Sequence, residues 1–344
     1  MRILTFAYPD EPDPHLGVLL GDVVVDLAIA RRWALEARGL PLQPLPASMF
    51  EFLYAGQNAL QYAHNLVNVL EGENPLELSI PDQLTVGRRI HEVSLYPPLP
   101  RPMSVRDFYA FEQHVVNARA TRNSEIPAEW YQFPVFYFSN TNAIFGPGET
   151  IPYPSYTQAL DYELEAACVI GKTGINIPAE QAEEYIFGYT IFNDWSARDI
   201  QRRETRVGLG PAKAKDFASS LGPWLVTPDE LADCATGRPG VYDLQMQARV
   251  NGELRSQGNW KEVYYSFGEM VERASQDVYL LPGELIGSGT VGNGCLLELT
   301  QGNGPWLQPG DLVELEIERL GKITNRVGRK GYSVVSGMGT ETPR

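Results

Sequence analysis

The stretch Asp161–Lys172 reads DYELEAACVIGK, and its two halves favour different surroundings. Residues 166–170 are all apolar, as in a strand that is covered on both faces of a sheet. Alternate residues of a strand point to the same face, about 6.6 Å apart, so Asp161, Glu163 and Glu165 would share one face. Two charges at that separation repel by roughly 2.5 kcal/mol at an effective dielectric constant near 20. A bound cation, a raised pKa or a bend toward water must relieve this repulsion.

A second acidic segment in the chain shows the ordinary alternative. Residues 313–318 read VELEIE, in which apolar and acidic residues alternate as in a half-buried strand with a solvated face. The acids of residues 161–165 could be solvated in the same way. They could instead point into a cavity, because the apolar residues that follow them leave no polar face for open solvent.

Length and composition indicate a globular protein. The chain has 344 residues, of which 43% are hydrophobic and 21% charged, so it can bury a sizeable core in one or two domains. The formal net charge of −15 argues against nucleic acid and anionic membranes as partners, because phosphates would be repelled. Three scattered cysteines favour a reducing cytoplasm, and the sequence has neither a signal-type start nor a run of about 20 apolar residues.

The order of segments favours an α+β fold with a small N-terminal domain. Three short strand-like segments open the chain, and residues 26–38 and 48–71 have the periodicity of amphipathic helices. The segment LYPPLPRP at residues 95–102 holds four prolines and predicts a linker. This linker divides the chain into a small N-terminal α/β domain, residues 1–95, and a strand-rich domain, residues 96–344.

The motif NDWSARDIQ follows an apolar segment and brings several polar residues together. Ser196 and Asp199 have the spacing of a helix-capping pair, which predicts a helix that begins there. Asp194 would then precede the helix, and Arg198 and Gln201 would share one of its faces. Routine capping with a surface arginine explains this motif equally well. In the alternative interpretation, Asp194 binds a cation, and the side chains of Arg198 and Gln201 donate hydrogen bonds to a ligand in the same pocket.

A further set of polar residues lies in the segment RDFYAFEQHVVNARATR. Asp107 and His114 are seven residues apart and would share one face of a helix. Arg119 and Arg122 could bind a substrate carboxylate or be solvated helix charges. Carboxylates with few histidines and no cysteine cluster favour Mg2+ or Ca2+ over zinc or copper.

Two glycine-bounded segments lie further along the chain. GLGPAKAKDFASS carries Lys215 but lacks the spacing of a phosphate-binding P-loop. GSGTVGNGC, residues 287–295, is a glycine-rich turn before a predicted strand at residues 296–300, which contains Glu298. Glycines of this kind are also typical of an ordinary tight connection.

The segments DFYAFEQH, LDYELE, NDWSARDIQ, GPAKAKDF, GSGT and LLEL, in this order, resemble the fumarylacetoacetate hydrolase family. The resemblance covers about residues 103–330. It implies a mixed β-roll catalytic domain that is usually dimeric, so we expect a homodimer. It also implies Mg2+, with Ca2+ or Mn2+ as alternatives, and a small-molecule oxo-acid substrate.

The resemblance implies roles for individual residues as well. Four carboxylates correspond to metal ligands: Asp107, Glu163, Glu165 and Asp194. Asp161 is not among them and has no implied role. His114 corresponds to the general base, and Glu298 to the acid that orients it. Three donors would surround the reacting oxygen: Arg198, Gln201 and Lys215. The remaining positions would contact the substrate: Tyr109, Tyr137, Thr290 and one of the two arginines Arg119 and Arg122.

The predicted reaction is hydrolysis of a carbon–carbon bond in a 2,4-dioxo acid or β-diketone, by water that His114 activates. The rival is decarboxylation, tautomerisation or hydration of a 2-oxo acid through an enolate. Decarboxylase and tautomerase members of the family tend to carry a Glu three residues after the histidine. Asn117 stands there, which favours the hydrolase. A scaffold that lost catalysis is a third reading, and the joint presence of His114, Glu298 and Lys215 argues against it.

Overall fold

The computed structural model describes residues 1–82, 84–334 and 341–343. Its largest sheet includes five strands from the first hundred residues: β1 (Arg2–Tyr8), β2 (Glu11–Leu20), β3 (Val23–Asp26), β4 (Gly87–Arg89) and β5 (Ser94–Leu95). Seven later strands complete it: β6 (Val105–Phe108), β7 (Phe136–Phe138), β8 (Ile144–Phe145), β11 (Leu164–Ile170), β12 (Ile186–Asp194), β14 (Ser219–Val226) and β17 (Leu285–Gly287). The order is β4-β3-β2-β1-β14-β12-β11-β17-β6-β7, with β5 beside β1 and β8 beside β14.

A second sheet has the order β16-β15-β18-β19-β9. Its strands are β9 (Thr150–Tyr153), β15 (Gln245–Val250), β16 (Glu253–Asn259), β18 (Leu312–Ile317) and β19 (Gly321–Lys330). Two short pairs complete the strands: β10 (Leu160–Asp161) with β13 (Ser196–Ala197), and β20 (Tyr332–Val334) with β21 (Glu341–Pro343). Strand β18 buries Val313, Leu315 and Ile317 and exposes Glu316, which confirms the predicted half-buried strand.

Helices cover the sheets. The α-helices are α1 (Leu27–Arg38), α2 (Met49–Val69), α3 (Glu112–Ala120), α4 (Arg198–Glu204), α5 (Phe267–Ser275) and α6 (Leu296–Leu299). The 3-10 helices are η1 (Ile90–Glu92), η2 (Ala128–Tyr131), η3 (Ala179–Glu184), η4 (Thr205–Val207), η5 (Pro228–Cys234) and η6 (Trp260–Glu262). Asp26 caps α1 and Ser48 caps α2 by accepting backbone N–H groups, so both N-terminal helices begin where the periodicity predicted.

Three local expectations were wrong. Asp107 lies on β6 and His114 on α3, so they do not share a helix face. The segment at 296–299 is a helix rather than a strand. The helix after NDW begins at Arg198, because Ser196 is part of β13 and pairs with β10.

The capping interpretation of NDWSARDIQ was wrong for the same reason. The Ser196 hydroxyl donates to the Asp194 carbonyl over 2.9 Å and not to the new helix. Asp199 instead accepts from the Thr157 hydroxyl and from the Gln158 backbone N–H. The strand pairing of residue 196 therefore replaces the local cap.

Strand β11 is covered on both faces, as its apolar composition predicted. Ala166 and Cys168 belong to the core that lies between the two main sheets, whereas Ala167 and Val169 pack into a core shared with α1 and α2. The chain bends before β11, which begins only at Leu164, so residues 161–165 do not form one regular strand.

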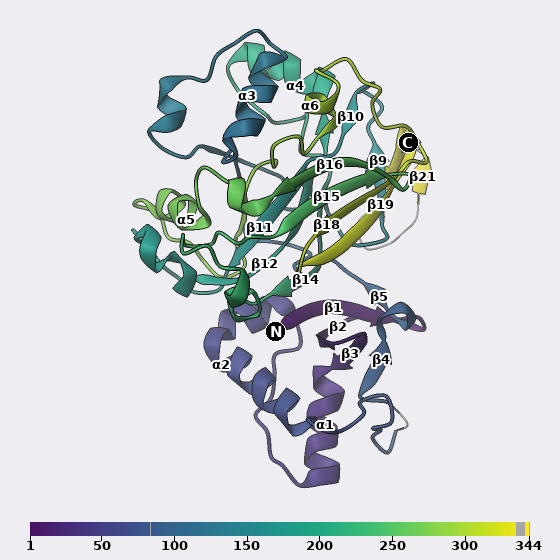
Figure 1. The fold of residues 1–344 in the computed structure, drawn as a ribbon. Helices are drawn as coiled ribbons and strands as arrows, with labels where there is room; N and C mark the ends of the chain where they lie inside the picture. The colour runs from purple at the N-terminus through teal and green to yellow at the C-terminus, as the bar shows by residue number, and fades with distance from the viewer. Residues whose placement is uncertain (83, 335–340, 344) are drawn as a thin grey trace.

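The first strands extend the main sheet. Strand β1 pairs with β14 in antiparallel orientation, with Arg2 opposite Val226. The N-terminal helices lie at one end of the molecule and α3, α4 and α6 lie at the other (Figure 1). The division of the chain at residue 95 stays a prediction. The mixture of helices and sheets, with no closed barrel among the described strands, agrees with the α+β prediction.

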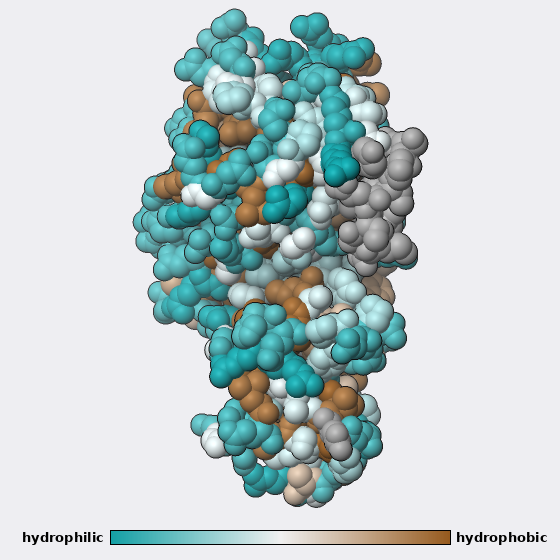
Figure 2. Space-filling model, turned by 90° about the vertical axis from the view of Figure 1, so that its right-hand side faces the viewer, coloured by the Kyte–Doolittle hydropathy of each residue, from teal (hydrophilic) through white to brown (hydrophobic). Residues whose placement is uncertain are grey.

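The surface is mainly polar on the face that Figure 2 shows, where hydrophobic residues gather only in small separate groups. None of the helices in the described part of the chain is long and apolar enough to cross a membrane.

Candidate active site

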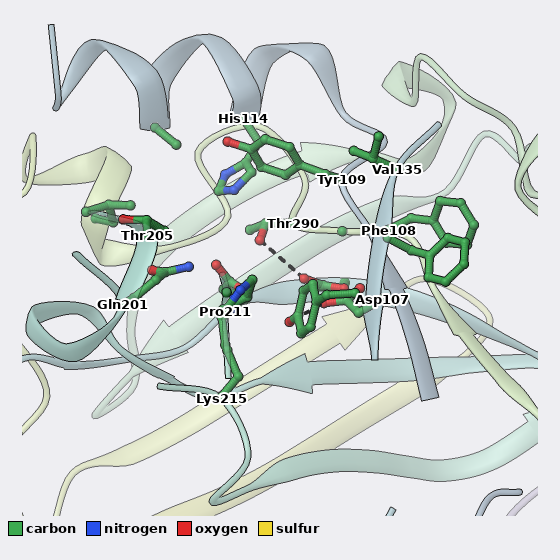
Figure 3. Close-up of a pocket in the computed structure, with 18 of the residues that line it drawn as sticks. Asp107, Phe108, Tyr109, His114, Val135, Gln201, Thr205, Pro211, Lys215 and Thr290 are labelled. Atoms are coloured by element: carbon green, nitrogen blue, oxygen red, sulfur yellow. Dashed lines mark hydrogen bonds and ion pairs between the residues drawn. The ribbon is translucent and has the colours of Figure 1, made fainter. Parts of the chain in front are cut away.

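A cavity of about 260 Å3 lies between α3, α4 and the ends of the central strands. Twelve of the residues that the sequence singled out line it: Asp107, Tyr109, His114, Arg119, Arg122, Tyr137, Glu163, Glu165, Arg198, Gln201, Lys215 and Thr290. The other two lie behind this lining, where Asp194 binds Lys215 and Glu298 binds His114. Figure 3 shows His114 and Tyr109 on one side of the cavity and Asp107 and Lys215 on the other.

Parallel strands β6 and β17 place Asp107 at the cavity. Gly287 on β17 lies opposite Asp107, and a Cβ atom at Gly287 would lie 2.5 Å from Asp107 Oδ1. A side chain at residue 287 would therefore displace this carboxylate. The glycine that begins GSGTVGNGC has a steric function at the site and is more than part of a tight connection.

The acidic residues form a compact buried cluster. Oxygen atoms of Asp107, Glu163 and Glu165 lie within 4.8 Å of one another. Asp194 is linked to this cluster, because the Tyr137 hydroxyl lies within hydrogen-bond distance of both Asp107 Oδ2, at 2.8 Å, and Asp194 Oδ2, and its single proton can be donated to either carboxylate. All four carboxylates are buried.

Burial sets the charge state of this cluster. It raises the pKa of Asp107 and, more strongly, the pKa values of Glu165 and Asp194. Burial acts on Glu163 in the same direction, but the attraction of Lys215 and Arg198 outweighs it and lowers the pKa of Glu163 to about 2. The repulsion expected among the acidic side chains is thus relieved by the raised pKa values and by the positive charges of the Lys215 and Arg198 side chains.

The cluster also has unused acceptor atoms. Asp107 Oδ1, Glu165 Oε2 and Asp194 Oδ1 are buried and accept no hydrogen bond from the described residues. Buried acceptors normally have partners, so these three atoms point to a missing donor or cation. Several carboxylate oxygens without cysteine or histidine suit a hard divalent cation. The residues present therefore fit a magnesium-type ion.

Lys215 lies among the carboxylates. Its Nζ atom donates to Asp194 Oδ2 over 2.6 Å and to Glu163 Oε2. The Thr290 hydroxyl, which Figure 3 labels, donates to Glu165 Oε1 over 3.2 Å. The sequence placed Lys215 at the reacting oxygen and Tyr137 at the substrate, and the structure places both side chains in direct contact with acids of the cluster.

Asp161, which had no implied role, holds Arg198 and the start of α6. Its carboxylate accepts from Arg198 Nε over 2.8 Å and from the backbone N–H groups of Leu296 and Leu297. Arg198 then reaches Glu163 Oε1 over 2.8 Å. No local pattern predicted this role, because the partners of Asp161 are 37 to 136 residues away.

His114 and Glu298 form a buried pair at the cavity. His114 Nδ1 lies 2.6 Å from Glu298 Oε1. Burial acts to raise the pKa of Glu298, but His114 and hydrogen bonds from the Asn293 backbone and the Asn117 side chain outweigh it, so the pKa is lowered. An ionised carboxylate only accepts hydrogen bonds, so Nδ1 carries the proton in this pair. The other ring nitrogen, Nε2, is left as a base.

Two arginine side chains offer unused donors at the cavity. Arg198 Nη2 and Arg119 Nε are buried and have no hydrogen-bond partner among the described residues. Arg122 also lines the cavity and is exposed to solvent. The site therefore combines unused acceptors in the acidic cluster with unused donors on arginines.

The chain resembles a known protein family and several of its members. The profile described as Fumarylacetoacetate (FAA) hydrolase C-terminal matches residues 104–328. The oxaloacetate tautomerase YisK of Bacillus subtilis (strain 168) is 28% identical over 315 residues, which are 90% of this chain and 96% of the relative. The mitochondrial oxaloacetate tautomerase FAHD2B of Bos taurus is 32% identical over 329 residues, or 95% of this chain and 91% of the relative.

The fold has solved counterparts. A 5-carboxymethyl-2-hydroxymuconate delta-isomerase from Mycobacterium smegmatis matches with a TM-score of 0.62 and 26% identity. The match covers 96% of this chain and 100% of the isomerase. The matches to the two relatives and to the isomerase therefore include the N-terminal region as well as the residues of the cavity.

Proposed function

The chain belongs to the fumarylacetoacetate hydrolase family of enzymes, and we propose that it interconverts the keto and enol forms of a short 2-oxo dicarboxylic acid such as oxaloacetate. The observation that carries this proposal is the position of the His114–Glu298 pair beside the acidic cluster, in one small cavity. Two relatives that match at least 90% of this chain are named oxaloacetate tautomerases, which supports the same substrate class.

His114 would act as the base. Its Nε2 atom takes a proton from carbon 3 of the keto acid, and the C–H electron pair becomes the C2=C3 double bond. The π electron pair of the C2 carbonyl moves onto the oxygen, which takes a proton from solvent water to complete the enol. The imidazolium of His114 then gives its Nε2 proton back to solvent, so the base is regenerated and no net proton is gained or lost. Glu298 stabilises the imidazolium that forms, because its carboxylate accepts from Nδ1 over 2.6 Å.

The acids of the cluster would hold Mg2+. Asp107, Glu163, Glu165 and Asp194 are the candidate ligands, since three of them carry buried oxygen atoms without partners. When bound, a divalent cation polarises the 2-oxo group and acidifies carbon 3. Arg198 and Gln201 lie at the same cavity and would bind the carboxylate end of the acid.

Arginines on the α3 side of the cavity favour a second carboxylate on the substrate. Arg119 has a buried Nε donor without a partner, and Arg122 follows at the cavity edge. Guanidinium groups match planar carboxylates with paired donors. We therefore propose a dicarboxylic rather than a monocarboxylic 2-oxo acid.

Hydrolysis of a carbon–carbon bond is the second candidate. A histidine paired with a buried carboxylate can take a proton from water as well as from carbon, and this pair is what favours the candidate. The two reactions differ in their products, because only hydrolysis yields two separate acids.

The test follows enol absorbance for oxaloacetate and an acylpyruvate, with Mg2+ and with excess EDTA. The proposal predicts Mg2+-dependent equilibration of enol and keto oxaloacetate without cleavage. Mg2+-dependent cleavage of the acylpyruvate, with no effect on oxaloacetate, would favour the second candidate and contradict the first.

A further inference from the structure

Asn117 lies three residues after His114 on α3 and binds the carboxylate that orients this histidine. Its side-chain amide donates to Glu298 Oε2 over 2.8 Å and to Asn293 Oδ1 over 3.1 Å. Gln113 Nε2 donates to the Asn117 carbonyl oxygen over 2.8 Å. Each part of the amide therefore has its own partner, and this fixes which side of the amide faces Glu298.

Glu298 accepts from four donors. Its Oε1 atom accepts from His114 Nδ1 over 2.6 Å and from Cys295 Sγ over 3.3 Å. Its Oε2 atom accepts from the Asn117 amide and from the backbone N–H of Asn293 over 2.9 Å. A carboxylate has about four acceptor positions, so Glu298 has none left for a substrate. Its function at the site is therefore exerted through His114.

The donors to Oε2 come from two parts of the chain. Asn117 belongs to α3, which carries His114, whereas Asn293 precedes α6, which carries Glu298. The Asn117 amide thus ties the helix of the base to the segment of its carboxylate. An acidic side chain at residue 117 would place a second negative charge where this donor now lies.

We propose that Asn117 is a positioning residue: by donating to Glu298 Oε2 it holds the carboxylate that keeps the proton of His114 on Nδ1 and leaves Nε2 as the base. This inference rests on the proposed function in one respect, namely the reaction in which His114 acts as the base. The hydrogen-bond network itself is independent of the substrate.

Two substitutions separate hydrogen-bond donation from shape. Asn117→Asp keeps the size of the side chain but replaces the donor with a charge that repels Glu298. Asn117→Ala removes the donor and adds no charge. Donation to a charged group predicts that kcat at pH 8 falls about tenfold for Asn117→Ala and about 100-fold for Asn117→Asp, with KM within about threefold. A packing role would make Asn117→Ala the worse variant.

A matched control comes from the same helix. Val116 precedes Asn117, its side chain is 42% exposed, and it contributes no polar group. Val116→Ala should retain the kcat and KM of the unsubstituted protein. Thermal unfolding of each variant checks that the helix is still folded. An Asn117→Asp protein with unchanged kcat would overturn the inference.

The second readout needs no turnover. Long-range 1H–15N spectra report which ring nitrogen of each of the four histidines carries the proton, and His114→Gln identifies the signal. The expected spectrum at pH 8 shows His114 protonated on Nδ1, with this preference reduced in Asn117→Asp. If the unsubstituted protein shows the proton on Nε2, the inference is wrong, whatever substrate is turned over. If the spectra agree but oxaloacetate is not converted, only the proposed function fails.

Discussion

Asp161 shows how single buried charges shape this site. The carboxylate accepts two backbone N–H groups at the start of α6 and an Arg198 N–H, and both side chains are buried. Arg198 in turn lies 2.8 Å from Glu163 in the acidic cluster. One acid that touches neither the cation site nor the substrate therefore supports both the arginine and the helix that carries Glu298.

Replacing Asp161 should be costly. Asp161→Asn leaves Arg198 buried with one carboxylate fewer, and the expected loss in the free energy of unfolding is about 3 kcal/mol. The urea midpoint measures it. Glu316→Gln, on the solvated face of β18, is the matched control and should change this free energy by less than about 0.5 kcal/mol. Equal effects of the two variants would show that the buried pair is not what stabilises this region.

His114 is the proposed base of the reaction. His114→Ala should lower kcat by about 10²- to 10⁴-fold, since it removes the proposed base. Binding of Mn2+ as a probe for the cation should remain close to that of the unsubstituted protein, because no candidate cation ligand is changed. Retained turnover in this variant would show that another group acts as the base.

Secondary-structure elements hold these residues in register. Strand β17 is short, and Gly287 allows it to approach Asp107 on β6 closely. Gly287→Ala should push this carboxylate aside and weaken Mg2+ binding about tenfold, with a smaller effect on folding. Calorimetric titration with Mg2+ measures the affinity, and thermal unfolding serves as the control. Unchanged affinity would remove Asp107 from the candidate ligands.

A separate pH effect belongs to the junction of β2 and α1. His15 Nδ1 lies 2.8 Å from Asp26 Oδ2, and this hydrogen bond raises the pKa of His15 above its ordinary value of 6.5. A raised histidine pKa stabilises the fold fully below the unfolded-state value, and this contribution is lost as the pH rises through the folded-state value. The stability lost in His15→Gln should therefore be larger at pH 5.5 than at pH 9, as measured by urea unfolding. His91→Gln, at an exposed position, is the control. An equal loss at both pH values would contradict this.

The elements show where sequence reasoning succeeds. Helices α1 and α2 and strand β18 follow from hydrophobic periodicity, and each was predicted. Helix α6 was predicted as a strand, because a segment of only four residues is too short to show a distinguishing period. Its helical form depends on Asp161, which lies 135 residues away from Leu296. Long-range contacts of this kind cannot be read from local sequence.

At the site, residues from separate motifs lie in or beside one cavity. All fourteen candidates line it or contact a residue that does, which follows from the order of the motifs and from the family resemblance. The hydrogen bonds of Asn117 and Asp161 were not predicted, because both depend on partners far along the chain. The prediction of hydrolysis, which came from the family resemblance and which Asn117 favoured, is not confirmed by the comparisons, since two relatives are named tautomerases.

The whole molecule is held together by one sheet and a shared core. Phe52 of α2 is fully buried and its ring lies 5.9 Å from the ring of Phe187 on β12, in an edge-on arrangement. Phe52→Ala should lower the free energy of unfolding by about 3–5 kcal/mol. Calorimetry of this variant should show a single unfolding transition, at a lower temperature than in the unsubstituted protein. Two separate transitions would show that the N-terminal region unfolds independently.

The homodimer that the resemblance implies stays a prediction, which sedimentation analysis can test.

Proton NMR of oxaloacetate in D2O, with the protein and Mg2+, tests the proposed keto–enol interconversion. We expect the carbon 3 protons to exchange faster than in protein-free Mg2+ solution, with the carbon skeleton intact. This exchange should be lost with excess EDTA and in His114→Ala. Formation of two acids at the protein-dependent rate, or exchange no faster than in the protein-free solution, would contradict the proposed interconversion.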